Sequence, residues 1–137
     1  MSLFDQIVEI NRKMFAEGNS HPAHVILVRD DEPLGLIVLP FIDSFIKQLI
    51  FGVVIPQIVR AHAPEACIFV LPSTMKEFVH DRVEVEDVVM VQEVDAIKIR
   101  TVIIKKGEIV EPEEENVQAN LLEPVREAMK SVWEEII

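Results

Sequence analysis

The residues from Phe41 to His62 have the sequence FIDSFIKQLIFGVVIPQIVRAH and form the most apolar segment of the chain. Apolar pairs recur in it at four-residue spacing, with polar residues between them, so a broad apolar stripe winds along a helix of period 3.6. The pairs are Phe41/Ile42, Phe45/Ile46, Leu49/Ile50, Val53/Val54 and Ile58/Val59. The segment therefore predicts one long helix that packs on the core.

Pro56 interrupts this helix. Proline has no backbone N–H, and its ring presses on the carbonyl four residues back, which here belongs to Gly52. We therefore expect a kink near Gly52–Pro56, or a break into two helices. The length approaches the roughly 20 residues of a membrane span, but Asp43 and Lys47 lie inside it together with three further polar side chains. A helix of the protein core is expected instead, and no membrane partner.

Size and charge limit the possible functions. With 137 residues, half of them hydrophobic, the chain is predicted to form one domain over residues 1–137. A net charge of −11 argues against nucleic acid and against anionic lipid as partners. The first twenty residues contain charged side chains throughout and no apolar signal segment, so a cytoplasmic location is expected. The only cysteine, Cys67, rules out an internal disulfide framework and is expected to be a buried hydrophobe.

Regular elements are predicted on both sides of the central helix. Leu3–Glu17 has the apolar periodicity of a helix. Ala23–Arg29 and Leu34–Leu39 are near-continuous apolar runs joined by the turn Asp30–Pro33, which predicts an antiparallel hairpin buried on both faces. A third buried strand is expected at Ala66–Leu71.

The second half of the chain is predicted to contain further strands and a final helix. We expect a short helical turn in Pro72–Arg82, capped by Ser73 and Thr74, and then a strand at Val83–Val94 with a β-bulge near Glu86–Asp87. Ala96–Lys105 alternates as a half-solvated edge strand would, and Glu108–Val110 could add a short edge strand. The last helix begins at about Leu121 or Pro124, with Pro124 best placed at its first position.

The predicted order is α-β-β-α-β-β-β-α. It indicates a single α+β domain with a mixed or antiparallel sheet of about five strands and helices packed on it. The order of elements is similar to that of roadblock and profilin-type domains. This resemblance concerns the order of elements alone and assigns no family.

Histidine is the first candidate for chemistry. His21 and His24 flank the start of a predicted strand, His62 ends the central helix, and His80 precedes Asp81. All four could converge on a metal together with Asp30 or Asp81, since neutral imidazole is a common metal ligand. The alternative is ordinary loop histidines, with His62 capping its helix.

Carboxylates are abundant. Asp30, Asp31 and Glu32 lie at a predicted hairpin tip, where Asp serves the turn itself. A second set could line one strand face as a divalent-metal site or an acid/base pair, or keep the protein in solution. This set consists of Glu84, Glu86, Asp87, Glu93 and Asp95. The acidic run Glu111–Glu115 is predicted to be a solvated loop.

Nucleophiles and anion sites are less well supported. Ser20, Ser44, Ser73, Thr74 and Cys67 are the possible nucleophiles, and none lies in a G-x-S-x-G frame. The four glycines are scattered, which excludes phosphate-cradling loops and dinucleotide folds. A small basic patch could bind an anion or protect a strand edge from aggregation. It comprises Lys98, Arg100, Lys105 and Lys106.

Two functions remain. The first is a non-enzymatic interaction or regulatory protein that self-associates, as a homodimer, through the wide apolar face of the central helix or through the strand Ala96–Lys105. The second is a small metal-dependent hydrolase that uses His and Asp/Glu. No cofactor is expected, and a protein partner is possible.

Overall fold

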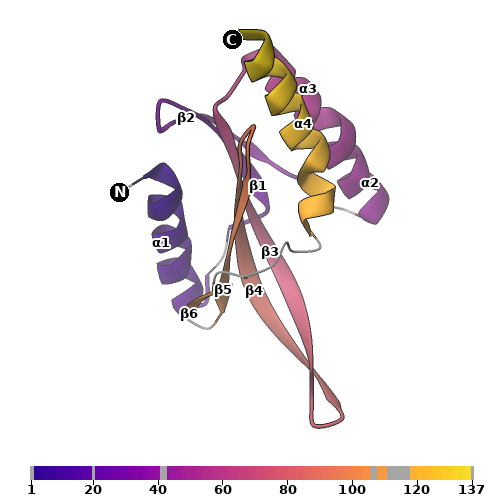
Figure 1. The fold of residues 1–137 in the computed structure, drawn as a ribbon. Coiled ribbons are helices and arrows are strands. Elements are labelled where there is room, and N and C mark those ends of the chain that lie inside the picture. The colour runs from indigo at the N-terminus through magenta and orange to yellow at the C-terminus, as the bar shows by residue number, and fades with distance from the viewer. Residues whose placement is uncertain (1, 20, 41–42, 106–107, 111–117, 137) are drawn as a thin grey trace.

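The computed structural model describes residues 2–19, 21–40, 43–105, 108–110 and 118–136 (Figure 1). These residues contain four α-helices, one π-helical segment and six strands. They are α1 (Leu3–Ala16), β1 (His24–Arg29), β2 (Glu32–Val38), α2 (Ser44–Leu49), η1 (Ile50–Val54), α3 (Ile55–His62), β3 (Ala66–Val79), β4 (Arg82–Val94), β5 (Ile99–Lys105), β6 (Glu108–Val110) and α4 (Gln118–Ile136).

The six strands form one sheet in the order β2-β1-β3-β4-β5-β6, and every neighbouring pair is antiparallel. An α+β fold with an antiparallel sheet is therefore confirmed, with six strands in place of about five. The short strand Glu108–Val110 lies at one edge, as predicted. The strand at Ala96–Lys105 was expected at an edge, and this is wrong. β5 lies between β4 and β6, and Val102, Ile103 and Ile104 are buried on both of its faces.

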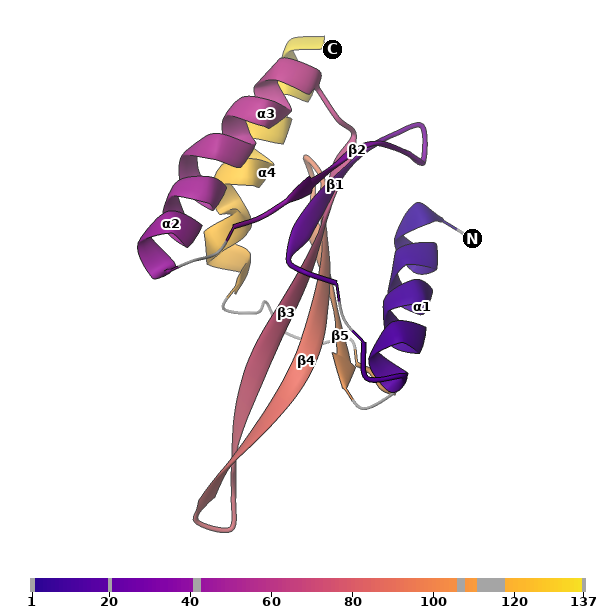
Figure 2. The same ribbon diagram turned by 180° about the vertical axis from the view of Figure 1, so that it is seen from behind.

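Helices cover both faces of the sheet (Figures 1 and 2). On one face α1 packs over β4 and β5, where Phe4, Ile7 and Val8 meet a cluster of valines and isoleucines. On the other face η1, α3 and α4 pack together over a second cluster built around Phe51 and Phe69. The strands between the two clusters alternate their side chains between them, which accounts for their continuous apolar sequences.

The central helix continues from Ser44 to His62 and does not separate into two helices, but its α-helical hydrogen bonding is interrupted by a π-helical segment beside the proline. α2 passes into η1, where the backbone N–H of Ile55 donates to the carbonyl of Ile50, five residues back. α3 then starts with Pro56 in its first turn, a position that needs no N–H donor. The wider turn carries the chain past Gly52 without a clash between the proline ring and a regular α-helical carbonyl.

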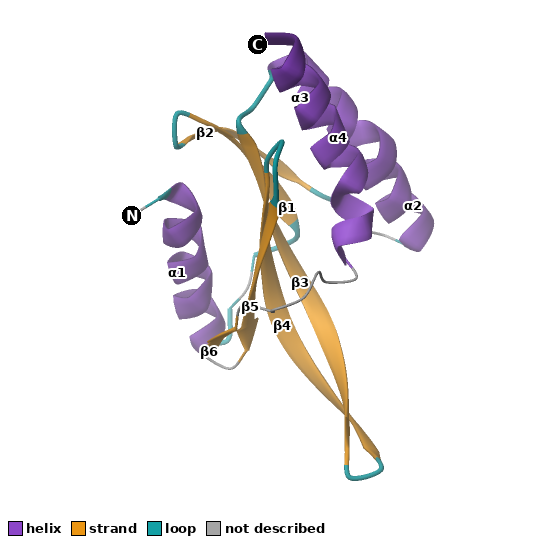
Figure 3. Cartoon of the chain, in the orientation of Figure 1, coloured by secondary structure: helices purple, strands orange, loops and turns teal. Residues whose placement is uncertain are grey.

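β3 and β4 are much longer than expected. They stay in register without a shift from Cys67↔Val94 to Val79↔Arg82. The predicted helical turn in Pro72–Arg82 and the predicted bulge near Glu86–Asp87 are therefore both wrong, because cross-strand pairing overrides the local helical preference. The two strands extend well beyond the rest of the sheet (Figure 3). His80 and Asp81 turn the chain at the tip with φ of 49° and 63°, the left-handed pair of a two-residue hairpin.

The hairpin β1–β2 is confirmed, and Asp30 and Asp31 turn it with φ of 55° and 57°. An unpredicted bulge lies at Leu27/Val28. β1 is buried on both faces, but β2 is mostly exposed, contrary to its prediction. β2 is at the edge of the sheet, so most of its side chains stay exposed although its sequence is apolar.

The final helix, α4, packs with η1 and α3 on the face of the sheet opposite to α1. The indole Nε1 of Trp133 donates to the carbonyl of Pro64 at 2.8 Å, and Val125 and Met129 are fully buried. Pro124 lies inside α4 and not at its first position, so that part of the prediction is wrong.

Candidate functional site

The four histidines lie in three separate places. The rings of His21 and His24 meet edge to face with centroids 5.5 Å apart, and the buried His24 shares a hydrogen bond between Nδ1 and the carbonyl of Pro22 at 2.8 Å. His62 ends α3 on the other side of the sheet, and His80 is at the tip of the long hairpin. Among the described residues no group of three or more His, Cys, Asp or Glu could hold a metal ion.

The aspartates of the first hairpin have structural contacts. Asp31 Oδ1 accepts a hydrogen bond from the backbone N–H of Leu3 at 3.0 Å, so it caps the start of α1 from a distant part of the chain. The backbone N–H of Asp30 donates to Glu65 at 3.1 Å. Both contacts reach distant segments of the chain, while the backbones of Asp30 and Asp31 form the turn itself with φ of 55° and 57°.

The carboxylates of β4 divide between the two faces of the sheet. Asp87 pairs with Thr74 of β3. Glu86 pairs with Met75 and Glu84 with Glu77, so these two glutamates are separated from Asp87 by an odd number of residues along β4. Cross-strand partners share a face and successive residues alternate, so Glu84 and Glu86 lie on the face opposite to Asp87. The run Glu111–Glu115 falls outside the described residues.

Glu93 is a half-buried carboxylate whose pKa is raised in the folded protein. Burial, aided by the neighbouring Asp95 carboxylate, raises its pKa, and the opposing influence of Arg100 and Lys98 is smaller. A raised pKa in the folded state means that the unfolded chain ionises first. The free energy of unfolding therefore falls as pH rises from the ordinary value of 4.5 through the raised one.

This predicts a pH-dependent effect of replacing Glu93 by glutamine. The Glu93→Gln variant should be more stable than the parent at about pH 7, and the gain should vanish at about pH 4, where the carboxyl is protonated in both states. Urea unfolding of both proteins at the two pH values measures it. The control is Glu84→Gln at an exposed position, which should leave the free energy of unfolding unchanged at both pH values. An equal effect of Glu93→Gln at both pH values would contradict the prediction.

Two of the possible nucleophiles, Cys67 and Ser73, are inaccessible or hydrogen-bonded, whereas Ser44 and Thr74 are exposed. Cys67 is buried, as expected, and burial raises the pKa of its thiol to about 12, so it stays protonated. Ser73 lies on a strand, and its Oγ donates to the carbonyl of Leu71 at 3.2 Å. Ser20 and Lys106 lie outside the described residues.

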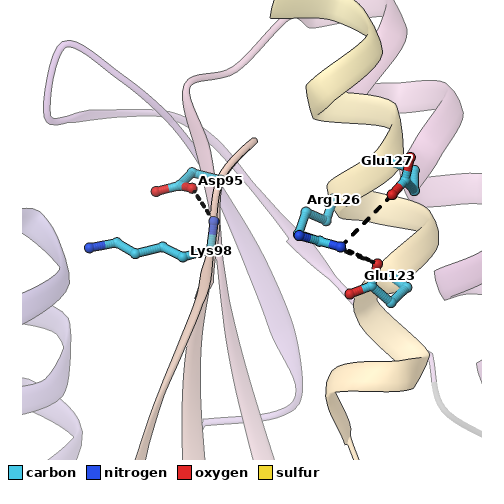
Figure 4. Close-up of polar contacts among 5 residues, drawn as sticks. All are labelled: Asp95, Lys98, Glu123, Arg126 and Glu127. Carbon is cyan, nitrogen blue, oxygen red and sulfur yellow. Dashed lines mark hydrogen bonds and ion pairs between the residues drawn. The ribbon is translucent and has the colours of Figure 1, made fainter. Parts of the chain in front are cut away.

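The basic residues are dispersed as well. The Arg100 guanidinium lies 4.7 Å from the centre of the Phe4 ring and 3.9 Å from Asp5, so it holds α1 to the sheet. Lys98 belongs to the β4–β5 turn, where its backbone N–H donates to Asp95 Oδ1 at 2.8 Å (Figure 4). On α4 Arg126 lies between Glu123 and Glu127 (Figure 4). These interactions are intramolecular.

The outer side of α2 and η1 is apolar and uncovered by the described residues. We call this surface the helix face. The exposed fractions of its side chains are 66% for Phe45, 40% for Leu49, 46% for Val53 and 44% for Val54. Gly52 lies beside them, and a Cβ added there would meet no atom within 4 Å. The inner side, with Ile50, Phe51, Ile55 and Val59, belongs to the core.

The same segment has membrane-like composition. Ser44–His62 is long and apolar enough, by length and composition only, to cross a membrane, with a mean hydropathy of 1.3 in a window that is 28% buried. This is a weak indication, because a helix of a protein core satisfies the same criterion. The expectation of a largely buried core helix is met by one side of the helix only.

A second exposed apolar surface lies on the long β3–β4 hairpin, which the sequence did not predict. Phe78 is 86% exposed, and Val83 and Val85 are exposed on the neighbouring strand. A third is a groove of about 310 Å³ between α1 and β2, lined by Ile10, Leu36 and Val38 among others. All three surfaces leave large apolar side chains exposed to water.

The described residues thus define an antiparallel α+β protein with helices on both faces of the sheet and exposed apolar surfaces. No family model matches the chain, and no match was found among curated proteins or solved structures. The resemblance in element order to roadblock and profilin-type domains therefore supports no functional conclusion.

Proposed function

We propose that this chain is a non-enzymatic interaction or regulatory protein that self-associates through the helix face. The supporting observation is the row Phe45, Leu49 and Val53, spaced by four residues and between 40% and 66% exposed, on a helix whose other side is core. Such a row leaves apolar area in water that a partner helix would cover.

Charge favours a second copy as that partner. The chain carries a net charge of −11, so two copies repel over most of their surface. Between Ser44 and His62 there is no Asp or Glu, and the only charged residues are Lys47 and Arg60. Two copies can therefore meet here without placing carboxylates against each other.

A two-fold arrangement suits this surface. In an isologous dimer the same patch contacts itself, so one helix packs antiparallel on its equivalent. The exposed Gly52 has open space where a side chain would be, which lets the partner backbone approach closely. Ile46 packs against the core, so it is a poor site for a test, and Leu49 is the better one.

Replacing Leu49 by aspartate tests the proposal. Native mass spectrometry of the parent should show a multiple of the 15.6 kDa chain, and the Leu49→Asp variant should show at most half that subunit number, since a buried unpaired carboxylate opposes the contact. Gln57→Asp, at an exposed polar position of α3, is the matched control and should keep the parent mass.

Other results would overturn the proposal. A monomeric parent, or a Leu49→Asp variant of unchanged subunit number, would remove its basis. Flotation of the monomer with phosphatidylcholine vesicles would assign the helix face to a membrane. One retained metal ion per subunit in the same spectra would favour the hydrolase hypothesis.

A further inference from the structure

Within the described part of the chain, no further strand pairs with the outer part of the β3–β4 hairpin, from Ser73 to Val88. β1 pairs with β3 only at Ala66–Val70, and β5 pairs with β4 only at Val89–Val94. We call this segment the arm. An isolated two-stranded hairpin is at best marginally stable in water, so an arm of this length gains from a further contact.

One face of the arm is apolar. Phe78 pairs with Val83, Lys76 with Val85 and Thr74 with Asp87, so these side chains share a face. Continuing the alternation along β4 leads to Val89 and Val91, which belong to the cluster under α1. The apolar face of the arm is therefore the α1 side of the sheet, with Phe78 86%, Val83 53% and Val85 62% exposed.

A cavity of about 510 Å³ lies at the base of the arm on this side. The end of α1 forms one wall through Phe15, Gly18 and Asn19. The other wall is the sheet itself, including Pro72 and Thr74 of β3. The molecule thus has an exposed phenyl ring at the tip of the arm and an open cavity with an aromatic wall at its base.

Tip and base are related by the geometry of the strand. Phe78 and Thr74 each lie two residues from Lys76, which is about 7 Å in either direction along a strand. A two-fold axis at the level of Lys76 and Val85 therefore places the tip of one arm over the base of another. We propose that two copies of this chain exchange arms in this way, with Phe78 of each entering the cavity at the base of the other.

The alternative of two arms stacked in parallel is excluded by α1. Packed sheets lie about 10 Å apart, but α1 stands on the same face and a helix with its side chains is about 10–12 Å thick. If two arms stacked in parallel, the α1 helices of the two copies would occupy the same volume and clash. In the antiparallel arrangement each tip ends where the partner's α1 ends, beside Phe15, which can form an aromatic pair with the entering Phe78.

Charge also favours this face. Its two charged residues, Lys76 and Asp87, have opposite signs. The axis brings the two Lys76 side chains near each other, and each is also within reach of the partner's Asp87, so the charges on this face balance. The opposite face carries Glu84 and Glu86 against the single Arg82, so two copies meeting there would bring together two surfaces of net negative charge. The arm therefore has one side suited to a second copy.

This contact is independent of the helix face, which lies on the other side of the sheet (Figure 2). Loss of one leaves the other available, and both together would join copies into a tetramer or a longer assembly. The failure of the helix-face proposal would be seen in Leu49→Asp, and the failure of arm exchange would be seen in the arm variants below.

A cysteine placed on the axis tests the exchange. In Val85→Cys the two thiols of a dimer face each other, so a short bis-maleimide should join the chains at least about tenfold faster than in Glu84→Cys, where the thiol lies on the other face. Cys67 does not compete, because it is buried and protonated.

A second substitution completes the test. Adding Phe78→Ser to Val85→Cys should reduce the rate to that of Glu84→Cys, whereas adding Leu49→Asp should leave it high. Equal rates for Val85→Cys and Glu84→Cys, or cross-linking that persists undiminished in Phe78→Ser, would overturn arm exchange whatever the outcome at the helix face.

Discussion

Replacing Phe51 by alanine is expected to lower the free energy of unfolding by about 3–5 kcal/mol. Phe51 is fully buried in η1, and its ring centroid lies 5.3 Å from that of Phe69 on β3. Its loss removes apolar burial, an aromatic contact and the packing of the central helix on the sheet. Urea unfolding followed by circular dichroism measures the effect.

Phe45 provides the matched control on the same helix. It is 66% exposed, so Phe45→Ala should change the stability of the folded monomer by no more than about 0.5 kcal/mol. It should instead weaken self-association, as expected for a residue of the helix face. A large loss of monomer stability in Phe45→Ala, or a small one in Phe51→Ala, would show that the inner and outer sides of the helix are wrongly assigned.

Replacing Gln92 by methionine is expected to stabilise the protein. Gln92 is fully buried on β4, and its Nε2 donates to Thr101 Oγ1 at 3.1 Å, while Oε1 has no partner among the described residues. Burying an unpaired carbonyl oxygen costs about 1–3 kcal/mol, and the lost bond to Thr101 is worth about 0.5–1.5 kcal/mol. Methionine has a similar shape and no such oxygen, so a net gain of about 1 kcal/mol should follow.

The midpoint of urea unfolding measures this gain. Gln57→Met, at an exposed position of α3, is the control and should change stability by less than about 0.5 kcal/mol. A loss of stability in Gln92→Met would mean that Oε1 has a partner outside the described residues, and that the polar pair on β4 and β5 holds the sheet together.

Several elements followed from the sequence because their causes are local. The period of apolar residues defined α1 and the central helix, and Pro56 indicated where its hydrogen bonding is interrupted, because the missing N–H acts on the residues next to it. The turn at Asp30–Asp31 and the short strand at Glu108–Val110 were likewise visible, since turn and edge signals lie within a few residues.

The predicted sites depended on residues that are distant in sequence, and periodicity contains no information on which of them meet. Histidines and carboxylates were found by type, yet the tertiary structure separates His62 from His24 and engages Asp31 in capping α1. The arm was missed because Ser73, Thr74 and Pro72 favour a turn locally. The signal that could have found it is the paired alternation of apolar residues around His80–Asp81.

By itself the sequence determined the class of fold, the buried character of β1 and of Ala66–Leu71 in β3, and the position of the interruption in the central helix, since these depend on composition and short-range spacing. Only the tertiary structure decided which apolar residues stay uncovered. Phe45 and Phe51 have similar sequence surroundings, and β2 is as apolar as β1, but burial depends on what lies on the other side of each element. That is a property of strand order and helix packing, because hydrophobic stabilisation follows the area removed from water and not the residue type.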